Sequence, residues 1–393
     1  MRQPSLAIIT THPIQYHTPF FRALASKIDL EVFYCYDATP KQQAAAGFGV
    51  DFQWDIPLLD GYSYRFLTKD FTVRDAITKT RFDAVAVNGW AYREAIEAVL
   101  TCWASATPVM VRSDSHLYSP RNPIKTFVKY LPYRTFISRM HACLSVGAWS
   151  TEYFLHYGAE PGRIFQVPHV IDEERFDREQ RQYRPQRNAI RKTWGIAENA
   201  VVFLFAAKFI EKKRPCDFVQ SVCRAASENP RIAGLMVGDG PLRQQCESLN
   251  EAQHGSVRFA GFLNQSEIAK AYVAADALVL PSDGDETWGL VVNEAMFCGL
   301  PCVVSDKVGS GPDLVLPETG DVFQLGNVDQ LTRILAALAQ DTTGLASMGC
   351  RARTLIQQRY SPSNAVDGIL TAMCAIGARN NLPVDPAYQN NQS

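Results

Sequence analysis

The chain has 393 residues, which is too long for one ordinary hydrophobic core, so we expect two domains. Its formal net charge of −1 gives no strongly basic surface and argues against nucleic acid as a partner. Its ten cysteines are scattered, with no C-x-x-C pair, which is typical of reduced core residues in a cytoplasmic protein. No apolar run approaches the roughly twenty residues that span a bilayer.

Short β-rich runs alternate with helical segments along the chain, which predicts βα units and parallel sheets. In the first half we expect strands at 6–10, 31–36, 84–87, 108–112, 142–146 and 164–167. In the second half we expect strands at 201–206, 232–237, 257–259, 277–280, 301–305 and 320–323. The predicted fold is α/β, with two Rossmann-like, doubly wound domains that face a cleft at the C-terminal ends of their strands.

The two domains meet near a strongly charged stretch at 175–191, which has no hydrophobic periodicity and is interpreted as a linker. We therefore assign 1–185 to the first domain and 186–359 to the second, with a flexible polar tail at 380–393. Asn264 and Glu267 have the spacing of a capping box for a helix at 266–274.

Polar side chains follow two of the strands expected in the first half. His12, Gln15 and Tyr16 come after the first strand and suit the binding of a hydroxylated acceptor. Asp114 and His116 come after the strand that ends at 112, where a histidine can face the cleft. A structural loop histidine is the alternative interpretation of His116.

Two loops of the second half have features of a phosphate site. The loop after 201–206 carries four cations between 208 and 214, among them Lys208 and Lys213. Fixed cations stabilise a diphosphate leaving group more in the transition state than in the ground state; a solvated basic loop is the alternative. Gly238, Asp239 and Gly240 follow the strand at 232–237, where glycine lets the backbone approach a ligand closely, although Asp-Gly also forms ordinary turns.

The most informative segment carries Glu286 and Glu294, eight residues apart. If all intervening residues were helical, roughly 12 Å would separate the two carboxylates, about the span from the sugar ring to the ribose of a sugar nucleotide. One carboxylate could then hold hexose hydroxyls and the other ribose hydroxyls. The backbone N–H groups of Gly289, Leu290 and Val291 would face the diphosphate. The alternative is a pair of surface glutamates at a helix N-terminus, where carboxylates are favoured.

Two further segments leave alternatives open. Asp283 and Asp285 form an Asp-x-Asp pattern that can bind a divalent metal, but a loop rich in Asp and Gly explains it equally well. Because lysines already supply positive charge, we expect no metal. The segment 121–139 interleaves five cations with apolar and aromatic residues and has no acid. It suits either an anionic membrane surface or a helix that faces the core with a solvated basic side.

The segment from Glu286 to Glu294, followed by Ala-Met-Phe-Cys-Gly-Leu-Pro, resembles the E-x7-E signature of retaining GT-B glycosyltransferases, specifically glycosyltransferase family 4. The likeness is dense from 201 to 323 and covers most of the chain. It extends to the order of the basic loop, the Gly-Asp-Gly turn and Gly261-Phe262.

The resemblance implies a role for each matching residue. Glu286 matches the glutamate that contacts donor-sugar hydroxyls, and Glu294 matches the one that binds ribose. Lys213 matches the lysine that neutralises the diphosphate, and Lys208 occupies a place where the family most often has arginine. His116 matches a first-domain histidine near the reacting sugar.

The resemblance also implies that backbone groups near Phe262 and Leu263 recognise the base, and that 360–378 packs back on the first domain. The loop at 12–17 replaces the glycine-rich first loop of the family, so acceptor contacts do not carry over there.

The reaction implied is transfer of a hexosyl group from a nucleotide diphosphate sugar to a hydroxyl of a glycan, glycolipid or small molecule, with retention and without a cofactor. The expected location is cytoplasmic, with contact to the inner membrane surface through 121–139 as an option. Two alternatives stay open. One is a GT-B nucleotide-sugar 2-epimerase or hydrolase that uses the same cleft, and the other is a sugar-nucleotide-binding subunit without turnover.

Overall fold

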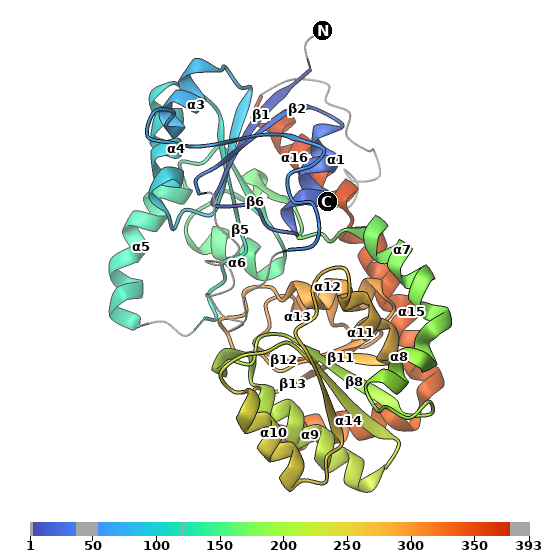
Figure 1. Ribbon diagram of the computed structural model, residues 1–393. Helices are drawn as coiled ribbons and strands as arrows, with labels where there is room; N and C mark the ends of the chain where they lie inside the picture. The colour runs from blue at the N-terminus through green and yellow to red at the C-terminus, as the bar shows by residue number, and fades with distance from the viewer. Residues whose placement is uncertain (1–2, 37–53, 120–121, 378–393) are drawn as a thin grey trace. The chain divides into compact units, whose positions relative to one another are not determined.

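The computed structural model describes residues 3–36, 54–119 and 122–377, and the chain divides into two compact α/β units (Figure 1). Among the described residues, the first unit comprises 3–36, 57–171 and 359–377, and the second comprises 54–56 and 172–358. Within these ranges, no helix is both long enough and apolar enough to cross a bilayer.

The described part of the first unit contains a parallel sheet in the order β3-β2-β1-β4-β5-β6-β7. Its strands are β1 Ser5–Thr10, β2 Asp29–Tyr34, β3 Ser63–Phe66, β4 Ala84–Asn88, β5 Val109–Ser113, β6 Ala142–Ser145 and β7 Ile164–Gln166. Its helices are α1 His17–Ala25, α3 Val73–Lys79, α4 Arg93–Ala104, α5 Pro123–Ile137, α6 Ala148–His156 and α16 Pro362–Ala375, with a 3-10 turn η1 at Pro161–Arg163.

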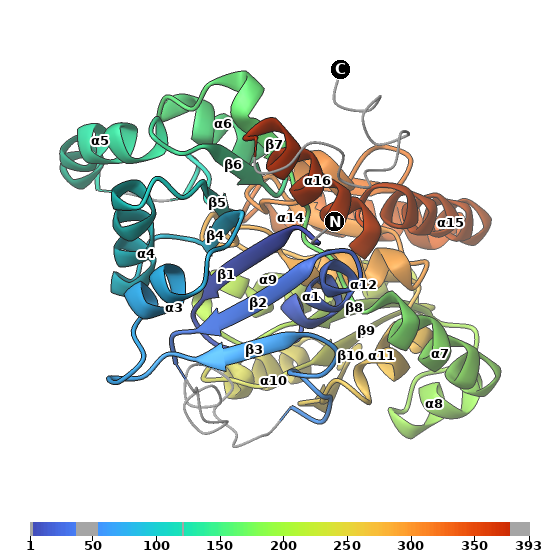
Figure 2. The ribbon, with the colours of Figure 1, turned by 90° about the horizontal axis from the view of Figure 1, so that it is seen from above.

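Helices cover both faces of this sheet, which is why its central strands are largely apolar (Figure 2). On one face, Leu6 and Ile8 of β1 pack in a cluster with α1 and with α16, which returns from the end of the described chain. On the other face, Ala7 and Ile9 pack in a cluster with α3, α4 and α6. The segment 360–378 was expected on the first domain, and α16 lies there.

The described part of the second unit contains a parallel sheet in the order β10-β9-β8-β11-β12-β13. Its strands are β8 Val201–Ala206, β9 Ile232–Val237, β10 Val257–Gly261, β11 Ala277–Leu280, β12 Cys302–Ser305 and β13 Gly320–Phe323. Its helices are α7 Glu173–Tyr183, α8 Arg187–Thr193, α9 Pro215–Glu228, α10 Arg243–Ala252, α11 Ile268–Ala274, α12 Leu290–Phe297, α13 Gly311–Leu314, α14 Val328–Gln340 and α15 Thr342–Arg359, with 3-10 turns η2 Arg184–Gln186 and η3 Glu211–Lys213.

The second sheet is also buried on both faces. Phe203 and Phe205 of β8 pack with Phe218 of α9 and with Leu331 and Leu335 of α14. Helices α11 and α12 contact β8 and β11 as well. The predicted architecture of two Rossmann-like α/β units with parallel sheets is therefore confirmed.

Every expected strand is present, with ends that differ by a residue or two, but β3 was missed. Its sequence, Ser-Tyr-Arg-Phe, alternates polar and aromatic residues because the strand lies at the sheet edge and pairs only with β2 among the described strands. A search for continuous apolar runs cannot detect such a strand.

The charged stretch at 175–191 was wrongly interpreted as a linker, because it forms α7 and α8. Arg175 and Arg191 are buried within the second unit. Arg191 donates hydrogen bonds to the carbonyls of Ala274 and Ala200 and forms an ion pair with Asp276 at 2.7 Å. The division of the chain therefore falls after 171, and α7 lies in the second unit rather than in the first.

The helix that was predicted at 266–274, with a capping box at Asn264 and Glu267, begins two residues later than expected. Helix α11 begins at Ile268, and Glu267 in the N-cap position makes no side-chain cap hydrogen bond. The Asn264 side-chain oxygen accepts a hydrogen bond from the backbone N–H of its neighbour Gln265, at 2.8 Å.

Candidate functional site

In the second unit, the candidate residues lie on both sides of the point where the strand order reverses. Strands β8 and β11 are neighbours, but the connections that follow them run to β9 on one side and to β12 on the other. In open parallel sheets, ligands bind outside the carboxyl ends of the strands at such a point. The loop after β8, at 207–214, and the loop after β11, at 281–289, therefore border the expected binding place.

The two loops are joined by a side-chain contact. The Lys213 ammonium forms an ion pair with Glu286, and both side chains are largely buried. Burial lowers the pKa of Lys208, and the positive charges of Lys213 and Lys212 lower it further. The neighbouring positive charges thus disfavour the charged form of Lys208, and a dianionic group beside Lys208 and Lys213 would relieve that repulsion.

Only glycine fits at both ends of the Gly-Asp-Gly turn, because the backbone of the basic loop lies too close for a Cβ atom. A Cβ atom on Gly238 would lie 2.0 Å from the Ala207 carbonyl oxygen, and one on Gly240 would lie 2.7 Å from that of Phe209. Both glycines have positive φ, at 127° and 152°. The close approach that we predicted toward a ligand is thus made to the neighbouring loop, which holds the backbone of the lysine loop in place.

Asp239 and the residues at the end of β10 also contact this turn. Asp239 forms an ion pair with Arg243 at 2.9 Å and accepts a hydrogen bond from the Gly240 N–H. The Gly238 N–H donates to the Gly261 carbonyl at 2.9 Å, which brings the end of β10 beside the turn. Phe262 and Leu263 follow directly and are partly exposed.

The segment between the two glutamates is not all helical, so the helical spacing assumed from sequence is wrong. Glu286 lies in a turn, and α12 begins at Leu290 after Gly289, which has a positive φ of 89°. The buried Trp288 indole N–H donates to Asn293 Oδ1 at 2.8 Å and ties the turn to the helix. Glu286 therefore lies on a loop, and Glu294 lies on the helix that follows it.

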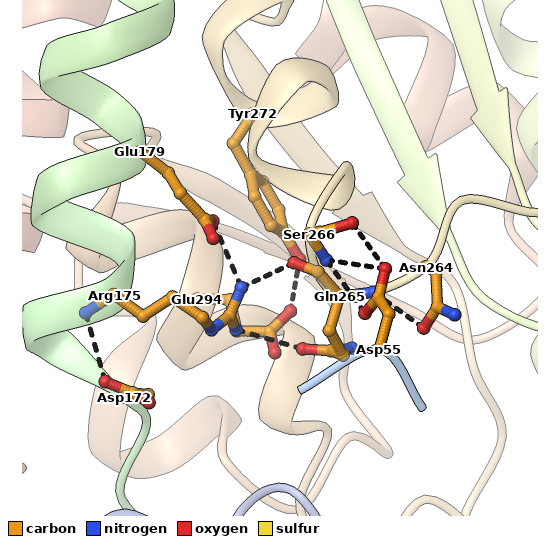
Figure 3. A network of polar contacts seen from close by, with 9 residues as sticks. All are labelled: Asp55, Asp172, Arg175, Glu179, Asn264, Gln265, Ser266, Tyr272 and Glu294. Atoms are coloured by element: carbon orange, nitrogen blue, oxygen red, sulfur yellow. Dashed lines mark hydrogen bonds and ion pairs between the residues drawn. The ribbon is translucent and has the colours of Figure 1, made fainter. Parts of the chain in front are cut away.

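Glu294 is buried in α12 and belongs to a network that sequence reasoning missed (Figure 3). The Tyr272 hydroxyl, from α11, donates a hydrogen bond to Glu294 Oε2 at 2.5 Å. Nearby, Arg175 of α7 donates to both the carbonyl and the side-chain oxygen of Gln265, at 2.6 and 2.9 Å, and pairs with Glu179 at 3.1 Å. The network fixes the start of α11, and hence Tyr272, relative to α7.

In the first unit, the expected acceptor-side residues follow β1 and β5. His12 is partly buried, which lowers its pKa, and Gln15 and Tyr16 precede α1 with partial exposure. His116 is buried; its Nδ1 accepts a hydrogen bond from the Tyr118 backbone N–H, and its ring lies 5.1 Å from that of Trp149. The accepting Nδ1 assigns the ring proton of neutral His116 to Nε2.

Asp114 lies beside two residues that were not in the predicted site. Arg112 is buried and donates to the carbonyls of Val167 and Pro168, and one of its guanidinium nitrogens lies 3.3 Å from His169 Nδ1. Asp114 lies 3.7 Å from His169 Nε2. Burial and the Arg112 charge lower the pKa of His169, so this ring is neutral near pH 7. In the sequence, two features could have indicated this cluster: the polar run that begins at 112 and the Pro-His pair at 168–169.

The Asp-x-Asp segment has a local explanation. Asp283 Oδ1 accepts a hydrogen bond from the Asp285 backbone N–H at 3.0 Å, and the Asp283 N–H donates to the Lys212 carbonyl at 2.8 Å. These bonds form a turn that joins the loop after β11 to the basic loop.

Residues 186–355 match the family described as glycosyl transferases group 1. The match covers a little under half of the chain and includes Lys208, Lys213, Glu286 and Glu294. Solved structures with the same fold span nearly the whole chain. A glycosyltransferase from Rickettsia africae aligns with a TM-score of 0.73 at 13% identity over 96% of this chain and 100% of that one. HepE from Anabaena, in complex with UDP and glucose, aligns with a TM-score of 0.70 at 14% identity over 95% of this chain and 100% of its own.

The two parallel-sheet units therefore have the GT-B fold of glycosyltransferases. Among curated relatives, the chain is 31% identical over 235 residues to a D-inositol 3-phosphate glycosyltransferase of Geodermatophilus obscurus, covering 56% of this chain and 49% of that protein. It is 26% identical over 212 residues to a GDP-mannose-dependent phosphatidylinositol monomannoside mannosyltransferase of Corynebacterium glutamicum, covering 52% of this chain and 54% of that protein. The chain thus matches about half the length of these curated relatives.

Proposed function

We propose that this protein is a retaining glycosyltransferase of family 4 that moves a hexosyl group from a nucleoside diphosphate sugar to an acceptor hydroxyl. The observation that carries the proposal is the pairing of Lys213 with Glu286 across the point where the strand order reverses, beside the partly buried Lys208. Cations suit a diphosphate, and a carboxylate suits the hydroxyl groups of a sugar.

The proposed reaction breaks the bond between the sugar C1 and the diphosphate oxygen, and the electron pair leaves with the diphosphate. The acceptor oxygen forms its bond to C1 on the same face, through an oxocarbenium-like transition state. The acceptor proton passes to the departing phosphate oxygen. Negative charge on that oxygen grows as the bond breaks, so Lys208, Lys213 and the first N–H groups of α12 lower the barrier.

Each of the other candidate site residues has a role in this proposal. Glu286 would accept hydrogen bonds from the transferred hexose, and its ion pair with Lys213 places it next to the ammonium that would bind the diphosphate. Glu294 accepts hydrogen bonds from the ribose and is oriented by Tyr272. His116 would contact the reacting sugar from the first unit, with His12, Gln15, Tyr16 and Asp114 on the acceptor side.

The relatives support a sugar-nucleotide donor but differ in the base: one is named for GDP-mannose, and one structure contains UDP. Their acceptors also differ, and we propose a hydroxyl of a glycan, glycolipid or small molecule. We further propose that no metal takes part, because lysines supply the positive charge.

The proposal is tested with purified protein and a panel of UDP, GDP, ADP and dTDP sugars. A donor present at a hundred times its dissociation constant should stabilise the fold by about 2.7 kcal/mol. NMR of the product with the best donor should give the same anomeric configuration as in the donor. Inverted product would refute retention, and turnover without any acceptor would indicate an epimerase or hydrolase instead.

A further inference from the structure

Helix α5 carries an apolar stripe that does not pack on the first unit. Ile124, Phe127, Val128 and Leu131 are exposed at 74, 84, 65 and 68%. Their spacing of three, one and three residues places them on one side of an α-helix. Large apolar side chains that are exposed together in this way mark a binding surface.

The opposite side of α5 holds the helix on its domain. Ile137 is buried, and Tyr130, Tyr133 and Phe136 pack against a core cluster of the first unit. At 100° per residue, this set points away from the exposed stripe. Helix α5 thus has a side that faces the core, as one of the two interpretations of 121–139 expected, but its solvent side is apolar at its centre and not only basic.

Cations border the stripe. By the same helical geometry, Lys125 and Arg134 lie on its two sides, whereas Lys129 lies farther round the helix, with its ammonium 5.9 Å from the Tyr133 ring centre. The sequence from 115 to 151 contains Arg121, Lys125, Lys129, Arg134 and Arg139 but no aspartate or glutamate. An apolar centre with a basic border is complementary to acyl chains below a layer of anionic head groups.

We propose that α5 binds the surface of an anionic membrane, with its axis in the plane of the lipid–water interface and with Phe127 and Leu131 inserted among the acyl chains. A second copy of the chain is a poorer occupant, because pairing two stripes would bring two borders of lysine and arginine together. A shallow apolar hollow lined by Trp103, Leu131, Pro132, Thr135 and Phe136 adjoins the stripe and extends the apolar surface. This surface is independent of the proposed transfer reaction, because binding needs neither donor nor acceptor.

The test is co-sedimentation of the full chain with vesicles of phosphatidylcholine alone and with added phosphatidylglycerol. We expect binding only to the anionic vesicles and its loss at high salt. The double variant Phe127→Gln/Leu131→Gln should weaken binding on the order of ten-fold or more, because inserted apolar area is lost. Lys125→Gln/Lys129→Gln should weaken it by about ten-fold at low salt. All four side chains are exposed, so the fold should persist.

Two control variants replace one exposed apolar residue and one exposed lysine elsewhere by glutamine: Val322→Gln on β13, and Lys27→Gln after α1. Both should bind like the wild type. The proposal is overturned if the wild type does not bind anionic vesicles, or if the α5 variants bind as tightly as the controls. It is also overturned if sedimentation velocity shows a dimer that only the Phe127→Gln/Leu131→Gln variant dissociates, because the stripe would then bind a second copy.

Discussion

Replacing Lys213 by alanine should separate a role in diphosphate binding from a structural role. In the structure this lysine is paired with Glu286. If it also binds diphosphate, the variant loses a charge-assisted contact worth about 1.5–3 kcal/mol. The dissociation constant for the free nucleoside diphosphate should therefore rise by about ten- to a hundred-fold. The value of kcat should fall by about 100- to 1000-fold, since the contact strengthens as charge develops.

Glu286→Gln gives a prediction that follows only from the observed pairing. Because Glu286 competes with the diphosphate for Lys213, removing its charge should leave the affinity for the free nucleoside diphosphate equal or up to about ten-fold tighter. Turnover should still fall, since the glutamine is a weaker acceptor for sugar hydroxyls. Opposite effects on affinity from the two single variants would distinguish ligand binding from general damage to the site.

The stability of these variants can be derived from the same pair. Breaking a fully buried ion pair costs about 3–5 kcal/mol, and we expect about 1–2 kcal/mol here because the Lys213 and Glu286 side chains retain 15 and 13% exposure. The melting temperature of Lys213→Ala should fall by roughly 3–6 °C. The double variant Lys213→Ala/Glu286→Gln should recover most of this loss, since no unpaired charge remains.

The assay is isothermal calorimetry with the nucleoside diphosphate that binds the wild type most tightly, together with thermal unfolding. Lys212→Ala is the matched control, because its ammonium lies 3.5 Å from the Asp285 carbonyl in an exposed contact. It should change affinity little. The reasoning is refuted if Lys213→Ala lowers the melting temperature but leaves the affinity equal to that of Lys212→Ala. Lys213 would then serve only as the structural partner of Glu286.

Three other predictions concern Glu294, the Asp-x-Asp segment and Glu173 at the start of α7. Glu294→Ala should weaken nucleoside diphosphate affinity by about ten-fold or more, and Tyr272→Phe by about two- to ten-fold, through loss of the hydroxyl that orients Glu294; unchanged affinity in folded variants would exclude the ribose role. Activity should survive EDTA, and loss that manganese or magnesium restores would instead support a metal at Asp283 and Asp285. Burial raises the pKa of Glu173 from 4.5 to about 7, so the folded state holds this proton more tightly and its stability falls as pH rises between those values. Glu173→Gln should therefore raise the melting temperature above pH 7 and have little effect near pH 4.5, and an equal shift at both pH values would show that the carboxyl does not titrate in this way.

Local sequence pattern was sufficient for most of the fold. Strands such as β8 and β9 are continuous apolar runs, because both sheet faces are covered and nearly every residue is buried. The basic loop and the glutamate segment could also be placed from sequence, since each follows a strand and ligands bind at strand ends. Local pattern failed where a partner lies far away, as with Arg175, which also donates hydrogen bonds to Gln265, 90 residues on.

What the sequence determined by itself is the set of chemical groups and the order of strands and loops that carries them: lysines after one strand, a glutamate after another and a second glutamate on the helix that follows. Only the tertiary structure decided which of these groups meet. Lys213 and Glu286 are 73 residues apart, and Tyr272 and Glu294 are 22 apart, so no local periodicity relates either pair. The same is true of α5, whose composition suited two environments. Its exposed stripe is evident only in the structure, where the opposite side of the helix packs on the first unit. Burial of a residue depends on the other parts of the chain that pack against it, which local sequence does not show.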